Sequence, residues 1–195
     1  MLEQIEKYAL DNSIPIMQKD GMLFLTEFIK NNNIKNILEI GTAIGYSAIN
    51  MALVSKDINI ISIERDTDRY NEAISNINKF NLQDRIKVIN DDAFNVSLEE
   101  EFDLIFIDAA KAQNIKFFNK FSPLLKNNKF IITDNLNFHG LVNEKEENLS
   151  RNLRQLTRKI KNYINFLKEN KEFETSFYEI GDGISVSKKI DRNNF

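Results

Sequence analysis

Short runs of β-branched and other apolar residues alternate along the chain with longer segments in which apolar residues recur at every third or fourth position. The runs that we expect to form strands are Asn36–Ile40, 58–64, Ile86–Asn90, 103–108 and 129–134. The periodic segments that we expect to form helices are 45–55, 67–81, 112–126 and 148–170. Continuous Val/Ile runs are typical of strands covered on both faces, and their alternation with helices builds a parallel sheet. The pattern therefore predicts an α/β fold.

The pattern changes in the last part of the chain. Two runs rich in β-formers, 173–180 and 184–190, flank the tripeptide Gly181-Asp182-Gly183. Glycines and aspartate between two such runs indicate a hairpin. We therefore predict a mostly parallel sheet that ends in an antiparallel hairpin, which is not the usual layout of dinucleotide-binding domains.

The segment before the first strand has a different character. We expect it to be a short helical lid over about 1–33, broken at Pro15 and Gly21. Asn31-Asn32-Asn33 has the composition of a turn and would lead into the sheet.

Composition narrows the class of protein. A chain of 195 residues suits one domain, and we expect a single domain over 1–195. The absence of cysteine excludes disulfides, zinc–thiolate sites and thiol catalysis. The start of the chain does not resemble a signal peptide, and no apolar run approaches the ~20 residues that span a bilayer. We therefore expect a soluble, cytoplasmic protein that does not interact with a membrane.

Positive charge is concentrated in one segment, although the formal net charge is −3. Within 151–168 the charged residues are all basic: Arg151, Arg154, Arg158, Lys159, Lys161 and Lys168. Such a stretch can bind a polyanion, or it can be the solvated face of a helix. Charge alone leaves both interpretations open.

A glycine loop follows the first predicted strand, in the sequence Glu39-Ile40-Gly41-Thr42-Ala43-Ile44-Gly45-Tyr46-Ser47. Glycines let the backbone turn sharply and approach a ligand at the start of the next helix. A P-loop would need a lysine after Gly45, and a nicotinamide fingerprint would need glycine at position 43. The remaining form, E-x-G-x-x-x-G, resembles the cofactor loop of methyltransferases.

Two acidic positions strengthen this interpretation. Glu64 ends the second predicted strand, where a carboxylate can accept hydrogen bonds from both ribose hydroxyls. Asp92-Ala93 follows the third strand, where an adenine would lie across the carboxyl edge of the sheet. The alternative for Glu64 is a solvent-facing glutamate at a strand end, and its combination with the glycine loop favours the ribose role.

Polar residues also end the fourth and fifth predicted strands. Asp108 follows the fourth strand, and Asp134 and Asn135 follow the fifth, so adjacent parallel strands can bring them to one edge of the sheet. Three oxygen ligands, two of them charged, suit Mg²⁺ and disfavour zinc. A nearby cation disfavours the ammonium form of Lys111, which would then act as a general base. Each of these residues alone could simply cap a strand or helix, and it is the set that favours a metal site.

Together, the motifs ILEIGTAIGYSAI, FIDAAK and TDN with Glu64 resemble the cation-dependent catechol/caffeoyl-CoA O-methyltransferase family over about 14–189. The resemblance implies the class I methyltransferase fold, a Rossmann-like three-layer sandwich. It implies metal ligation (Mg²⁺ or Mn²⁺) by Asp108, Asp134 and Asn135, with Lys111 as the catalytic base. The contacts that we expect with S-adenosylmethionine are at Met17, Glu39, Gly41, Tyr46, Ser47, Glu64, Asp92, Ala93 and Asp108.

Within that family, IPIM, GTAIGYSAI and GDGISVSKK are most similar to bacterial tRNA 5-hydroxyuridine methyltransferases. In that group Met17 would lie against the methionine end of the cofactor. The chain departs from the family at Asp91, where glycine is frequent, and at Ala110, where plant members have aspartate. We also expect fewer N-terminal helices over the acceptor site than in small-molecule members, and therefore a more open mouth to the site. His139, the only histidine, lies after the metal ligands and is interpreted as a loop residue rather than a catalyst.

Three functions can be compared on this basis. The favoured one is methylation of 5-hydroxyuridine in tRNA to 5-methoxyuridine, because the 5-hydroxyl and the C4 carbonyl can chelate one metal as a catechol does. The basic stretch would then hold phosphates. The alternative is a small catechol-type acceptor, which needs no basic stretch. A non-catalytic binding module is disfavoured by the intact metal and base residues. The resemblance also implies a homodimer, and no DNA partner is expected.

Overall fold

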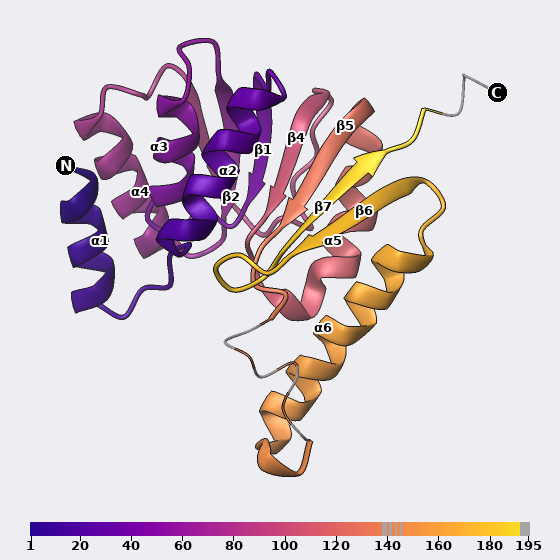
Figure 1. Cartoon of the computed structure of the whole chain (residues 1–195). Helices are drawn as coiled ribbons and strands as arrows, with labels where there is room; N and C mark the ends of the chain where they lie inside the picture. The colour runs from indigo at the N-terminus through magenta and orange to yellow at the C-terminus, as the bar shows by residue number, and fades with distance from the viewer. Residues whose placement is uncertain (138–139, 141, 143, 145, 192–195) are drawn as a thin grey trace.

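The computed structural model describes residues 1–137, 140, 142, 144 and 146–191 of the chain (Figure 1). In this part of the chain, one seven-stranded sheet has the order β3-β2-β1-β4-β5-β7-β6. Its strands are β1 (Asn36–Ile40), β2 (Asn59–Glu64), β3 (Ile86–Asn90), β4 (Phe102–Ile107), β5 (Leu125–Thr133), β6 (Phe173–Tyr178) and β7 (Ile184–Lys189). The pairs among β1 to β5 are parallel, whereas β7 runs antiparallel to both β5 and β6. The predicted parallel sheet with a closing antiparallel hairpin is therefore confirmed.

Helices cover both faces of this sheet, which gives the predicted three layers (Figure 1). They are α1 (Leu2–Asp11), α2 (Lys19–Asn31), α3 (Tyr46–Leu53), α4 (Thr67–Lys79), α5 (Asn114–Phe121) and α6 (Arg151–Glu169), with short 3₁₀ turns η1 (Lys111–Gln113), η2 (Ser122–Leu124) and η4 (Glu146–Asn148). Residues of α2, α3 and α4 share one buried cluster with Ile37 and Leu104. Residues of α5 and α6 share the other with Leu38 and Ile105. Successive residues of a strand thus point into opposite buried clusters, because side chains alternate between the two faces of a sheet.

Local sequence explains where several elements begin and end. Helix α4 starts after Asp66, whose side chain accepts hydrogen bonds of 3.0 Å from the backbone N–H groups of Asp68 and Arg69. Helix α2 ends at the predicted asparagine turn, where Asn33 takes a positive φ of 49°. Asparagine tolerates this left-handed conformation better than most residues.

The predicted break of the N-terminal segment at Gly21 is wrong. Helix α2 runs through Gly21, and the interruption lies instead around Pro15, between α1 and α2. A Cβ at position 21 would lie 3.0 Å from Cε of Met17. Glycine at position 21 therefore allows close packing against Met17. The sequence alone could not distinguish this packing role from that of a helix breaker.

Two further boundaries differ from the sequence prediction. Strand β5 begins at Leu125, earlier than expected, because it continues from η2 into the sheet. The helical segment expected over 112–126 is split into η1, α5 and η2, with Pro123 in the last of these. Proline is compatible with the first turn of a helix but not with its interior, so the long helix cannot form.

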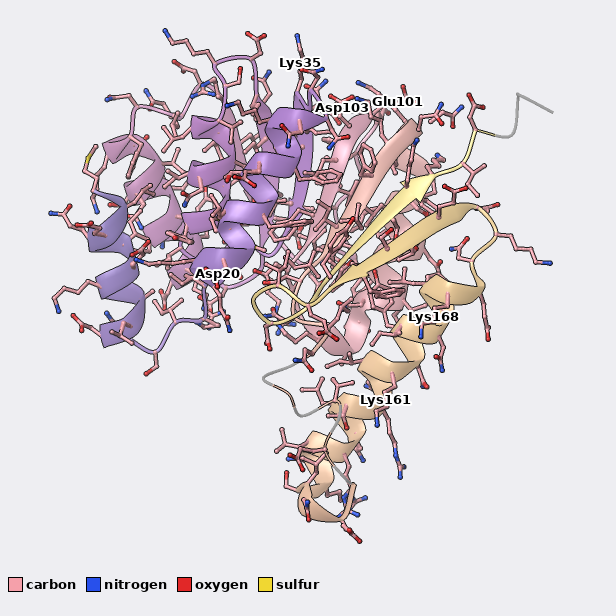
Figure 2. The ribbon with its side chains drawn as sticks, in the orientation of Figure 1. Asp20, Lys35, Glu101, Asp103, Lys161 and Lys168 are labelled. Atoms are coloured by element: carbon pink, nitrogen blue, oxygen red, sulfur yellow. The ribbon has the colours of Figure 1, made fainter. Side chains whose placement is uncertain are left out.

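A buried carboxylate ties the amino ends of the central strands together. Asp103 of β4 accepts hydrogen bonds of 3.0 Å from the backbone N–H groups of Lys35 and Asn36, and one of 3.1 Å from the ammonium of Lys126. Figure 2 shows Asp103 and Lys35 at the same end of the molecule. The opposite, carboxyl edge of the sheet carries the site described next. Among the described residues, no helix is both long enough and apolar enough to cross a lipid bilayer.

Candidate functional site

A cavity of about 690 Å³ lies at the carboxyl ends of the parallel strands. The residues that were predicted for the site and line this cavity are Met17, Gly41, Tyr46, Ser47, Glu64, Asp92, Ala93, Asp108, Lys111 and Asn135. The ligand crevice of open α/β sheets forms at this edge. Glu39 and Asp134 are the two predicted residues that do not line it.

The glycine loop is shaped by a close backbone contact. Gly41 has a φ of 101°, and a Cβ there would collide with the backbone oxygen of Asp108. The N–H of Gly41 donates to the carbonyl of Ile63, at 3.0 Å, while the N–H of Asp108 donates to the carbonyl of Ile40, also at 3.0 Å. The loop after β1 is therefore fixed between β2 and β4, and only glycine fits at position 41.

Glu39 lies beneath the cavity rather than in its wall. Its carboxylate is fully buried and accepts hydrogen bonds from the hydroxyls of Ser47 and Ser62. Burial raises the pKa of Glu39 to about 7, although both hydroxyl hydrogen bonds oppose the rise. Glu39 thus holds the side chain of Ser47, which lines the cavity, while a contact between Glu39 itself and the cofactor stays a prediction.

Glu64 serves the loop as well as the cavity. Its carboxylate accepts backbone hydrogen bonds from Ala43, at 2.8 Å, and from Asp66, at 2.9 Å. Ala43 has a positive φ of 46°, so Glu64 stabilises an uncommon backbone conformation. Each carboxylate oxygen keeps a further lone pair, and Glu64 lines the cavity. The arrangement is compatible with the ribose role, which stays a prediction.

The loop after β3 adopts its shape without the glycine that is frequent in the family. Asp91 accepts hydrogen bonds from the N–H of Asp92, at 2.7 Å, and from the side chain of Asn95, at 2.9 Å. Asp92 in turn accepts one of 2.9 Å from the N–H of Phe94. Asp91 is not among the positive-φ residues of the described chain. A non-glycine residue is therefore unstrained at this position.

An aromatic wall that the sequence analysis missed lies beside this loop. The rings of Phe94 and Phe117 stack with centroids 4.9 Å apart, and both residues line the cavity. Phe94 is 39% exposed, so part of its ring is open to a ligand in the cavity. Such a wall can cover the face of an adenine ring. Phe117 could not be singled out from the sequence, because its helical spacing matches that of any core residue.

Of the two predicted acidic metal ligands, Asp134 is buried and Asp108 is partly exposed, and the charge of Asp108 acts on Asp134. Burial raises the pKa of Asp134, and the charge of Asp108 raises it further. Burial also raises the pKa of Asp108, while the charge of Lys111 opposes that rise. The N–H of Asn135 donates to Asp134, at 2.7 Å, and Asn135 takes a φ of 63°. Two repelling carboxylates and an amide are a set of hard oxygens that a divalent cation would stabilise.

The described residues hold no group of three or more His, Cys, Asp or Glu side chains suited to a metal. The predicted set differs from such a group because its third member is the amide of Asn135. Sequence reasoning also missed a neighbour of this amide: Nδ2 of Asn135 donates to Oδ2 of Asp182, at 3.2 Å. Asp182 was interpreted only as part of a turn. His139 lies outside the described residues.

The N-terminal segment contributes one wall of the cavity. Pro15, Ile16, Met17 and Gln18, between α1 and α2, line it. Met17 is buried, and its contact with the methionine end of the cofactor stays a prediction. The phenol of Tyr46, another lining residue, donates a 2.8 Å hydrogen bond to Glu6 of α1. The lid is thus tied to the start of α3.

An open α/β sheet with an antiparallel hairpin, a glycine loop after β1 and an acidic residue at the end of β2 together define a class I, S-adenosylmethionine-dependent methyltransferase. Comparison with known sequences gives the family: the O-methyltransferase profile matches residues 1–190, and the chain belongs to this family. It is an S-adenosylmethionine-dependent O-methyltransferase.

Individual relatives are similar over nearly the whole chain. A putative caffeoyl-CoA O-methyltransferase structure from Staphylococcus aureus is 38% identical, with a TM-score of 0.91, and the match covers 96% of this chain and 91% of that one. An O-methyltransferase from Bacillus cereus, in complex with SAH, is 26% identical, with a TM-score of 0.83 over 96% of this chain and 90% of that one. The caffeoyl-CoA O-methyltransferase of Populus kitakamiensis is 29% identical over 95% of this chain and 82% of its own length.

Proposed function

We propose that this O-methyltransferase depends on a divalent metal and methylates an acceptor with two adjacent oxygens, 5-hydroxyuridine in tRNA. The observation that carries the metal dependence is the interacting pair of carboxylates formed by Asp108, which lines the cofactor cavity, and Asp134, which is buried beside it. Two carboxylates held this close destabilise each other in their ionised forms, and a divalent cation between them would relieve the repulsion. The residues that would hold Mg²⁺ or Mn²⁺ are Asp108, Asp134 and Asn135.

The chain's own residues then define the chemistry. Bound there, the cation would supply acidification of the acceptor hydroxyl. Lys111 lines the same cavity and would accept the hydroxyl proton. The acceptor oxygen forms its bond to the methyl carbon as the bond from that carbon to sulfur breaks, leaving neutral S-adenosylhomocysteine. Gly41, Ser47 and Glu64 would fix the donor so that attack occurs in line.

A stripe of positive charge on α6 supports the choice of RNA. Its members are all exposed and follow one another along the helix at intervals of three, four or seven residues. They are Arg151, Arg154, Arg158, Lys161 and Lys168. This spacing places them along one face of the helix. Figure 2 labels Lys161 and Lys168 on α6, and the ammonium of Lys168 lies over the ring of Phe177, 5.7 Å from its centroid. Because α6 packs against η1, which begins with Lys111, the helix that carries this basic stripe adjoins the proposed reaction site.

The test combines binding with product analysis. Affinity for tRNA should fall with salt, with a log–log slope of about −0.7 per phosphate contact on single strands. The double variant Arg154→Ala/Lys161→Ala should flatten the slope, whereas Lys56→Ala/Lys87→Ala, of equal charge change and remote from α6, should not. Mass spectrometry should detect 5-methoxyuridine in hydroxyuridine-containing tRNA treated with the enzyme. Methylation that is equal in both double variants at every salt concentration would remove the basic stripe from substrate binding.

A small catechol-type acceptor is the second candidate, and the caffeoyl-CoA O-methyltransferases among the relatives favour it. It would use the same metal and base residues without the basic stripe. Turnover of a catechol with no product on tRNA would establish this function in place of the first.

We also propose that the protein forms a homodimer, as the family resemblance implies. The edge strand β6 exposes Phe177 and Tyr178, and the ring of Tyr178 contacts Phe24 of α2, with centroids 4.9 Å apart. A second copy could cover these rings. Light scattering on purified protein, compared with Phe177→Ser, tests the assembly.

A further inference from the structure

We infer that Asp182 is a positioning residue that turns the amide oxygen of Asn135 toward the metal. The inference rests on the proposed metal dependence and adds a residue outside the predicted ligand set. Oδ2 of Asp182 lies 3.2 Å from Nδ2 of Asn135. Asp182 is only 3% exposed, so this contact is formed away from bulk water.

The chemistry of the two side chains gives the contact its direction. An asparagine amide presents an oxygen on one side and an NH₂ group on the other, and a metal ion can use only the oxygen. An ionised aspartate accepts hydrogen bonds and donates none. When Asp182 holds the NH₂ group, the oxygen of Asn135 must point away from Asp182. Outer partners of this kind orient metal ligands in many proteins.

The backbone keeps Asp182 in place opposite Asn135. The N–H of Leu136 donates to the carbonyl of Gly183, at 2.9 Å, and the N–H of Asn137 donates to the carbonyl of Asp182, at 2.8 Å. A Cβ at Gly183 would lie 2.8 Å from the backbone nitrogen of Asn137, so glycine permits this close approach. The hairpin turn is therefore fastened to the loop that carries both Asp134 and Asn135.

The charge of Asp182 also reaches the metal ligands, since it contributes to the raised pKa of Asp134. A nearby negative charge would attract any cation, so a loss of metal affinity on removing Asp182 has two explanations. The first is that the amide of Asn135 is no longer oriented. The second is that the metal ion loses the electrostatic attraction of the Asp182 carboxylate. These predict opposite results when position 135 carries a carboxylate, which presents oxygen on both sides and needs no orientation.

The experiment measures Mn²⁺ affinity by electron paramagnetic resonance, with S-adenosylhomocysteine bound. In the otherwise native protein, Asp182→Ala should weaken Mn²⁺ binding by about 10–100-fold, the range for removal of an outer partner. In the Asn135→Asp background the same substitution should leave Mn²⁺ affinity unchanged or improve it, because two facing carboxylates are separated. Asp182→Asn should retain part of the affinity, since its carbonyl can still accept the hydrogen bond.

Controls separate this inference from its alternatives. Asp103→Asn alters another buried aspartate, at the opposite end of the strands, and should lower the melting temperature without changing Mn²⁺ affinity. Equal weakening by Asp182→Ala in both backgrounds would overturn the positioning role, and so would native affinity in Asp182→Ala. If Asp182→Ala does not fold, Asp182→Asn is measured instead, with Asn and with Asp at position 135. Equal weakening of Mn²⁺ binding in the two proteins would again overturn the positioning role. Failure of the unsubstituted protein to bind Mn²⁺ would instead overturn the proposed metal dependence.

Discussion

The phenol of Tyr46 donates a 2.8 Å hydrogen bond to Oε1 of Glu6, across the boundary between the N-terminal lid and the methyltransferase sheet. Oε2 of the same carboxylate pairs with Lys19 at the start of α2, at 2.8 Å. The hydrogen bond from Lys19 is the main cause that lowers the pKa of Glu6. One carboxylate therefore joins α1, α2 and α3 beside the cavity.

The Tyr46–Glu6 bond should contribute to stability more than the Lys19–Glu6 pair. Tyr46 is buried, so Tyr46→Phe should lower the free energy of unfolding by about 1 kcal/mol. Lys19 is largely exposed, and solvent screening should make Lys19→Ala nearly neutral. Urea denaturation of both variants measures the difference. Equal losses would mean that the lid is held by other contacts.

Cofactor binding should depend strongly on Glu64. Its carboxylate supports the backbone at Ala43, and the ribose hydroxyls would add charge-assisted hydrogen bonds. We expect Glu64→Ala to weaken S-adenosylmethionine binding by about 1.5–3 kcal/mol, which titration calorimetry can measure. Glu99→Ala, at an exposed loop position, is the matched control and should bind like the unsubstituted protein. Unchanged affinity in Glu64→Ala would remove Glu64 from the ribose role.

Turnover should require a divalent cation held at Asp134. A chelator should abolish methyl transfer, and added Mg²⁺ or Mn²⁺ should restore it. Asp134→Ala should lose this metal-dependent activity while still binding cofactor, because Asp134 does not line the cofactor cavity. Asp20→Ala, an exposed change on α2, should keep both properties. Full activity in excess chelator would contradict the metal mechanism.

The buried carboxyl of Glu39 should make stability depend on pH. Burial raises its pKa from 4.5 to about 7, so the folded state favours the protonated form. Its contribution is therefore fully present below pH 4.5 and is lost as pH rises through 7. Relative to Glu39→Gln, the native protein should lose on the order of 3 kcal/mol across this range. Chemical denaturation of both cofactor-free proteins from acid to neutral pH tests this, and a constant difference between them would contradict it.

The layered fold could be predicted because hydrophobic periodicity reports which faces of each element are buried. The cavity's glycine loop, Glu64 and Asp108 followed from the rule that ligands bind at the carboxyl edge. The position of Glu39 did not follow, because Ser62, one of its partners, lies on a neighbouring strand whose register sequence cannot give. Asp182 was missed for the same reason, since its contact with Asn135 depends on the pairing of β5 with β7.

Insertion of β7 between β5 and β6 has a consequence for the order in which the molecule folds. The cofactor half of the site, from the glycine loop to Asp108, is built on β1 to β4, which pair in parallel. The loop with Asp134 and Asn135 is held by residues 182 and 183, which follow all the helices. Residues 182 and 183 are also synthesised after β1 to β5, so this loop can be held only when nearly the whole chain is present. A chain in which the hairpin has not yet docked would therefore hold the donor half of the site before the proposed metal-binding loop is in place.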